Sequence, residues 1–221
     1  YGICEWTNSY GRLNTTNNNI KIENLTYQVP GKSTKIYNVN FCETTVLANN
    51  TSEKAKRIRT ECKDLGGNKY KCYDRLSRLK MALVNVLTST KVDDEVQMGI
   101  GQFSTPTGSK VVKNTNSGKI EYKHDGFSGF VLNPVVELTP DNRDSLLLKI
   151  VALEAYNGTP SAAAYAEAGA YMLGANTSGE NNSGYDYSHI NSKNGNNGYL
   201  APLTVDQRNS KCNGQGIYFL T

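Results

Sequence analysis

Cysteines are the residues whose spacing says most about chemistry in this chain. They are five in number, at positions 4, 42, 62, 72 and 212. None forms a CxxC pair, and the two histidines cannot complete a zinc site at this spacing. Cys62 and Cys72 bracket a turn-rich segment containing Gly66-Gly67, so the chain can double back and bring both sulfur atoms together. We therefore predict a local Cys62–Cys72 disulfide.

Cys4 and Cys42 are the second predicted pair, which leaves Cys212 without an assigned partner. Disulfides persist in oxidising compartments, so the pattern favours an extracytoplasmic protein. The alternative is a set of free, buried thiols in a cytosolic protein. The sequence shows no signal peptide and no apolar run long enough to span a membrane, and its start without Met suggests a fragment.

The other polar residues form no catalytic set. Neither His124 nor His189 has a nucleophile in a recognisable motif beside it, and the sequence holds no GxSxG, P-loop or GxGxxG motif. The acidic run Asp93-Asp94-Glu95 is typical of a solvated turn. We therefore predict a protein that is not an enzyme and that works by binding.

Basic residues are concentrated between Lys54 and Lys80, although the net charge of the whole chain is only +4. Such a run is either a solvated face or a patch that binds a polyanion. No aromatic or glycine pattern of a nucleic-acid-binding module accompanies it, so nucleic acid is not among the predicted partners.

Thr159 is the polar residue with the clearest local context. The pair Thr159-Pro160 is typical of a helix start, with threonine as the capping residue and proline in the first turn. This threonine is either an ordinary N-cap or a hydroxyl that helps to hold an ion, because ligands of open α/β sheets gather at helix N-termini and strand ends. Both interpretations stay open.

The elements that must position these residues follow from apolar periodicity and capping signals. Helices are expected at 74–88, 141–156 and 160–173, buried strands at 96–103 and 216–220, and a polar hairpin at 110–123. Since helices and strands alternate, we predict an α/β fold with a mainly parallel sheet and helices on both faces.

The chain is expected to have two parts. Residues 1–73 are rich in Asn and Thr, carry four of the cysteines and show little helical periodicity, which is typical of a disulfide-containing insertion with a few short strands. Residues 74–221 are the expected core. Within this core, residues 175–213 are rich in Asn, Gly and Ser and are predicted to form a long surface loop.

Four segments carry a resemblance to a known family, in this order: Arg75–Leu83, Val96–Ser104, Gly158–Ala168 and Gly216–Thr221. Together they resemble a von Willebrand factor A (vWA) domain, in the version found at the N-terminal end of PilC/PilY1-type proteins. Those proteins are tip-associated adhesins and assembly factors of bacterial type IV pili. The resemblance covers residues 74–174 and 214–221.

This resemblance implies a vWA-like (Rossmann-like) sheet and a non-catalytic binding domain at the pilus tip. Surface attachment and pilus assembly would be its roles, with a host-cell or surface receptor and minor pilins as partners. The family's adhesion site holds a divalent cation, Mg²⁺ or Ca²⁺. Of its ligand positions only a threonine can be carried over, onto Thr159, so a cation is expected only in the intact protein. The alternative function is a carbohydrate- or matrix-binding module of another secreted surface protein.

Overall fold

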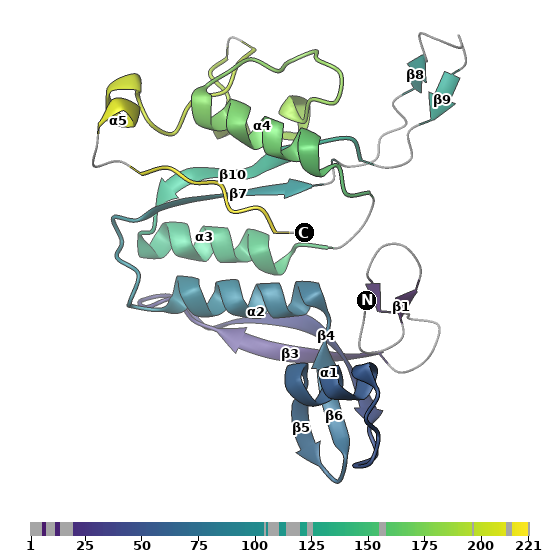
Figure 1. Cartoon of the computed structure of the whole chain (residues 1–221). Coiled ribbons are helices and arrows are strands. Elements are labelled where there is room, and N and C mark those ends of the chain that lie inside the picture. The colour runs from purple at the N-terminus through teal and green to yellow at the C-terminus, as the bar shows by residue number, and fades with distance from the viewer. Residues whose placement is uncertain are drawn as a thin grey trace. The chain divides into compact units, whose positions relative to one another are not determined.

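A computed structural model describes most of the chain, namely residues 6–7, 12–13, 20–103, 105, 111–113, 120–122, 126–154, 158–195, 197–210 and 214–220. The chain divides into two compact units (Figure 1). The first consists of residues 1–94 and 138–156, and the second of residues 95–137 and 157–221. The expected division at residue 73 into an insertion and a core stays a prediction.

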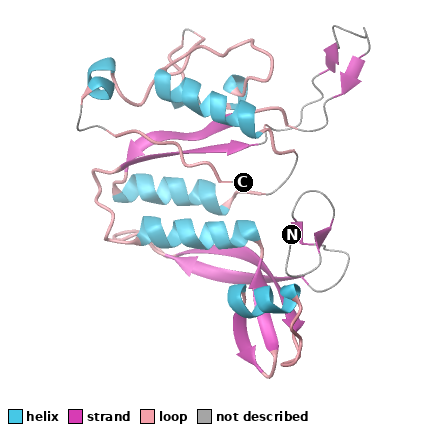
Figure 2. Cartoon of the chain, in the orientation of Figure 1, coloured by secondary structure: helices cyan, strands magenta, loops and turns pink. Residues whose placement is uncertain are grey.

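The first unit is built on a four-stranded antiparallel sheet in the order β3-β4-β6-β5 (Figure 2). These strands are β3 (Ile20–Tyr27), β4 (Lys35–Thr45), β5 (Lys63–Gly66) and β6 (Lys69–Tyr73). In β4, Tyr37, Val39 and Phe41 are buried while the residues between them are exposed, which is the period-2 alternation of a sheet with one covered face. A further pair in this unit joins β1 (Trp6–Thr7) and β2 (Arg12–Leu13).

Three helices complete the first unit: α1 (Glu53–Glu61), α2 (Arg75–Thr88) and α3 (Pro140–Val151). In Figure 1, α2 and α3 lie side by side, and α2 also contacts β4. Asp74 caps α2 by accepting a hydrogen bond from the backbone N–H of Ser77, and Thr139 caps α3 ahead of Pro140. The predicted starts at 74 and 141 are confirmed to within one residue, because local capping chemistry sets them. α3 ends at Val151, five residues before the expected end.

The second unit pairs β7 (Gln97–Phe103) with β10 (Gly129–Glu137) in an antiparallel sheet on which α4 (Ser161–Leu173) packs. A Cβ added at Gly129 would come within 2.8 Å of the Cβ of Ala164, so only glycine lets the helix approach this closely. α4 ends where the sequence predicts, at Leu173, and is followed by Gly174, whose φ of 71° is that of a left-handed C-cap.

The predicted polar hairpin is present as β8 (Val111–Lys113) paired with β9 (Ile120–Tyr122). The segment predicted as a long loop contains two 3-10 turns, η2 (Tyr185–Tyr187) and η3 (Ile190–Ser192), and a short helix, α5 (Val205–Asn209). It is more than a surface loop, because Tyr185 and Tyr199 are buried in a cluster with Val131 and Tyr171.

The predicted mainly parallel, vWA-like sheet is wrong. Every strand pair among the described residues is antiparallel, and the fold is a small α+β arrangement of one four-stranded sheet and separate two-stranded ones. The segment 216–220 forms no strand, although Phe219 stacks on Phe103 with ring centroids 5.1 Å apart. Apolar periodicity indicates that a segment is extended and buried, but it does not indicate which strand lies beside it or in which direction.

Candidate functional site

The segment from Ser52 to Tyr73, which we call the disulfide lobe, contains α1 and the β5–β6 hairpin. Cys62 ends α1 and Cys72 lies in β6, and their Cα atoms are 4.6 Å apart in a disulfide. Three residues with positive φ, Gly66, Gly67 and Asn68, make the turn between them. The predicted Cys62–Cys72 bond and the turn that allows it are thus confirmed.

α1 turns a small apolar face toward the sheet. Ala55 and Ile58 are buried there in a cluster that also contains Cys42, Val46, Tyr70 and Cys72. The Oγ of Ser52 caps the helix by accepting a hydrogen bond from the N–H of Ala55, at 3.2 Å. The helix is therefore fixed by its cap, by two buried side chains and by the disulfide, and its remaining residues except the half-buried Arg59 are exposed.

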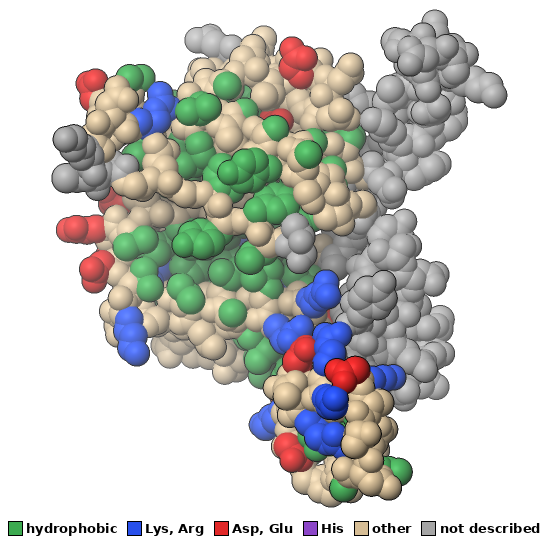
Figure 3. Space-filling view, viewed as in Figure 1, with side chains coloured by type: hydrophobic (Ala, Val, Ile, Leu, Met, Phe, Trp, Pro, Cys, Tyr) green, Lys and Arg blue, Asp and Glu red, His purple; other side chains and the backbone are tan. Residues whose placement is uncertain are grey.

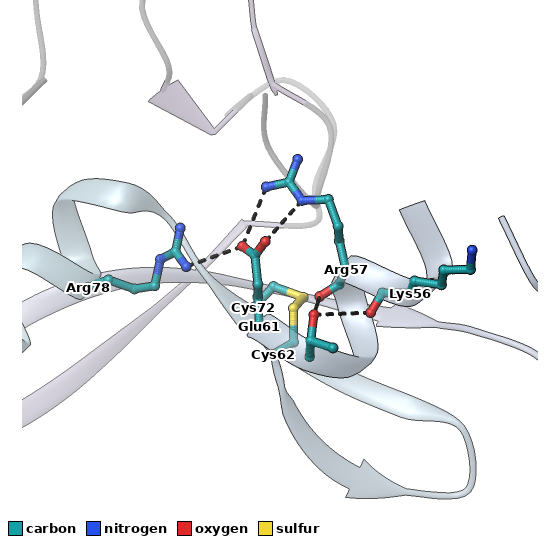
Figure 4. A network of polar contacts seen from close by, with 7 residues as sticks. Lys56, Arg57, Glu61, Cys62, Cys72 and Arg78 are labelled. Atoms are coloured by element: carbon teal, nitrogen blue, oxygen red, sulfur yellow. Dashed lines mark hydrogen bonds and ion pairs between the residues drawn. A yellow bond between two sulfur atoms is a disulfide. The ribbon is translucent and has the colours of Figure 1, made fainter. Parts of the chain in front are cut away.

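Two arginines share one carboxylate on the outer side of this helix (Figure 4). Arg57 donates from Nε to the Oε1 of Glu61 at 2.9 Å, and Arg78, from α2, donates to the other oxygen at 3.3 Å. The side chains of Arg57 and Arg78 are 45% and 43% exposed. The hydrogen bond from Arg57 lowers the pKa of Glu61, and the charge of Arg78 adds to the effect. One negative charge thus orients two positive ones, and the cluster keeps a net positive charge.

The surroundings of this cluster are basic as well. Ten basic and four acidic residues fall between Glu53 and Lys80, an excess of six, whereas the whole chain has an excess of only four. In the space-filling view, Lys and Arg side chains gather over α1 with a few acidic ones between them (Figure 3). Lys54, Lys63 and Lys69 are exposed. The lobe itself, residues 52–73, holds seven basic and three acidic residues, so it is a positively charged surface on a scaffold fixed by the disulfide.

Two members of the basic run have structural roles instead. Lys71 lies on the opposite face of the sheet, where its Nζ is 2.6 Å from the carboxylate of Glu23 and 4.1 Å from the ring centroid of Phe41. Glu23 also accepts a hydrogen bond from the hydroxyl of Tyr73 at 2.6 Å. The half-buried Lys80 donates to the carbonyl of Val151 at 2.7 Å, and burial lowers its pKa. These contacts depend on residues distant in sequence, so the charge pattern alone could not separate these two lysines from the rest.

The structure places Thr159 differently from the prediction. α4 begins at Ser161 with Pro160 at the N-cap position and no side-chain cap, while Thr159 is exposed and only its backbone carbonyl accepts the N–H of Ser161. The predicted side-chain cap is therefore wrong.

In the part of the chain that the structure describes, no group of three or more His, Cys, Asp or Glu is placed to hold a metal ion. A single hydroxyl does not bind a hard cation, so a cation held in part by Thr159 in the intact protein stays a prediction.

The remaining residues that the sequence singled out are the other cysteines and the two histidines. Cys42 takes part in a disulfide, but its predicted partner Cys4 lies outside the described residues, as do Cys212 and His124. His189 accepts the N–H of Asn191 through Nδ1 and opens η3, which is the role of a turn residue.

Comparisons with protein-family models, with curated proteins and with solved structures found no match to this chain. None of the described helices has the length and apolar character needed to cross a membrane. The Cys62–Cys72 bond fits the predicted oxidising compartment.

Acid should destabilise the first unit through its paired carboxylates. Arg57 lowers the pKa of Glu61 and Lys71 lowers that of Glu23, so each folded carboxylate stays charged at a pH where the unfolded chain is protonated. Their stabilisation is complete above the unfolded pKa of about 4.3 and is lost as the pH falls through the lower folded value. Urea unfolding between pH 3 and 7 should show this loss, and the Glu23→Gln/Glu61→Gln variant should show a shallower one. Glu53→Gln controls for removing one charge from α1, and an equally steep loss in the double variant would contradict the assignment.

Proposed function

We propose that this chain is a non-catalytic binding module of an extracytoplasmic surface protein, of the type IV pilus-associated adhesin class, acting in surface attachment and pilus assembly. The observation that carries the proposal is the disulfide lobe, which presents an excess of exposed positive charge on a stapled helix. The class is supported by the resemblance to PilC/PilY1-type proteins that four segments carry in this order: Arg75–Leu83, Val96–Ser104, Gly158–Ala168 and Gly216–Thr221.

The geometry of the lobe suits recognition. Ordering long side chains on binding costs free energy, and Arg57 and Arg78 are already oriented by Glu61. Charges arranged in advance also speed encounter with a partner of opposite charge and reject partners of like charge. Host-cell or surface receptors and minor pilins are the proposed partners, and the pilus tip is the proposed location.

The proposal is tested by adding the labelled, purified chain to host cells and by measuring its affinity for purified minor pilins with surface plasmon resonance. We expect saturable binding that unlabelled chain competes away, and weaker attachment of piliated bacteria when the cells are first saturated with the chain. Binding to neither cells nor pilins would overturn the proposal. Binding to matrix or carbohydrate without any to minor pilins would favour a carbohydrate- or matrix-binding module of another secreted protein, for which the basic lobe is the supporting observation.

A further inference from the structure

Arg57 of the disulfide lobe and Arg78 of α2 have hydrogen-bonding capacity that Glu61 does not use. A guanidinium carries five N–H donors. Arg57 directs Nε and one terminal nitrogen toward Glu61, and Arg78 directs only one terminal nitrogen there, at 3.3 Å. Both side chains are more than two-fifths exposed. The unused donors form a fork of the kind that matches a sulfate or carboxylate group.

Further positive charge extends from this pair along α1. Lys54 precedes Arg57 by three residues and Glu61 by seven, so all three lie along one side of the helix. With a rise of about 1.5 Å per residue, this row covers about 10 Å, and Arg78 extends it onto α2. Lys56 is paired with Glu53, and Arg59 donates to the carbonyl of Leu47. The row of positive charge thus consists of Lys54, Arg57 and Arg78, and it suits an extended ligand with repeated negative charges.

The outer side of α1 also limits the kind of ligand. Its exposed residues are all polar, namely Glu53, Lys54, Lys56, Arg57, Thr60 and Glu61. No aromatic ring stands among them on which a nucleobase could stack. They likewise provide no apolar anchor of the kind that dominates protein interfaces. A ligand held here is recognised by charge and by hydrogen bonds, which are what an acidic carbohydrate offers.

We propose that the Arg57–Glu61–Arg78 cluster is the central subsite for an acidic polysaccharide, whose sulfate or carboxylate groups bridge the two guanidiniums while Lys54 binds a neighbouring acidic group. This inference rests on the proposed function and gives it a ligand class. Glu61 acts here as a positioning residue, because it orients both arginines without contacting the ligand.

The test is isothermal titration calorimetry of the full chain at physiological ionic strength. The probes are a heparin octasaccharide, a hyaluronan octasaccharide that carries carboxylates only, and neutral dextran. We expect binding of the two acidic probes, with heparin tighter, and none of dextran. The Arg57→Ala/Arg78→Ala variant should lose about tenfold or more in affinity. The matched control, Lys91→Ala/Lys149→Ala, removes the same charge from exposed positions elsewhere in the first unit and should change affinity less than threefold.

The Arg57→Lys/Arg78→Lys variant separates fork geometry from net charge. It should fall between wild type and the double alanine variant, because an ammonium cannot replace the planar fork. If the Lys91→Ala/Lys149→Ala control loses as much affinity as the double arginine variant, the subsite is overturned, because the acidic probes would then be attracted by the net charge of the chain. Equal affinity for anionic lipid vesicles or for single-stranded DNA would overturn the carbohydrate assignment. If cells or pilins bind the chain but the acidic probes do not, this inference fails while the proposed function stands; if nothing binds, both fail.

Discussion

Replacing Arg143 by methionine should lower the free energy of unfolding by about 3 kcal/mol or more, because it leaves several buried carbonyl groups without a donor. Arg143 lies on α3 and is only 3% exposed. Its Nε donates to the carbonyl of Leu138 at 2.6 Å, and its terminal nitrogens donate to the carbonyls of Leu87, at 3.3 Å, and of Val92. Leu87 belongs to the last turn of α2, so this arginine hydrogen-bonds a carbonyl group at the carboxyl end of a neighbouring helix.

Urea denaturation of wild type and variants measures this effect. Arg143→Lys keeps the charge but not the five-donor fork, so it should recover only part of the loss. Lys149→Met, at an exposed position on the same helix, is the control and should stay within about 0.5 kcal/mol of wild type. The assignment is wrong if the methionine variant is as stable as this control, since the carbonyl groups would then find other donors.

Arg143 also shows where sequence reasoning reached its limit. The helix around it was predictable, because Thr139-Pro140 marks its start and leucines recur along its buried side. Within the run Asp141-Asn142-Arg143-Asp144, however, an arginine is typical of a solvated surface. It is buried because the chain between α2 and β7 folds back over it. No local sequence pattern predicts that this segment lies against α3.

Glu167 in the second unit is another buried charged residue that the sequence did not predict. It lies in the Ala-rich helix α4 and is a buried carboxylate. Thr177 and Tyr199 donate hydroxyl hydrogen bonds to its Oε1 at 2.7 and 2.6 Å, and burial, together with that hydrogen bond, raises the pKa of Tyr199. Both partners come from the segment predicted as a surface loop. The polar composition of 175–213 indicated solvent exposure, whereas its hydroxyl groups satisfy a buried acid.

The candidate site was predictable only in part, because the sequence indicated no helix in residues 1–73, where α1 (Glu53–Glu61) lies. Arg57 and Glu61 stand four residues apart, a spacing that favours an ion pair on a helix. The Cys62–Cys72 bond followed from the glycine turn between the two cysteines. The contribution of Arg78 could not be predicted, because it depends on how the start of α2 lies against the end of α1. The strand order failed for the same reason, since pairing partners are set by tertiary packing.

Removing the disulfide should have the second large effect, and it should be concentrated in α1. In the chain-entropy account, a cross-link that closes a loop of about ten residues contributes about 3 kcal/mol. α1 has nine residues, of which only Ala55 and Ile58 are buried, and a helix this short is not stable by itself. Cys62→Ser/Cys72→Ser should therefore speed amide hydrogen exchange throughout α1 far more than in the longer α2.

The Cys62→Ser/Cys72→Ser variant also shows whether ligand affinity depends on an ordered α1 or only on the net charge of the lobe. It changes no charged residue, so a ligand held only by the net charge of the lobe should bind it as well as wild type. If a formed helix must hold Arg57 and Glu61 in place, the variant should bind the acidic octasaccharides more weakly and also lose protection of the α1 amides against exchange. The reason is that the arginines must then be ordered during binding. Dithiothreitol should reproduce this fall in wild type but add little in the variant, where any further change reports the disulfide of Cys42. Unchanged exchange in α1 would contradict the idea that the disulfide fixes the helix.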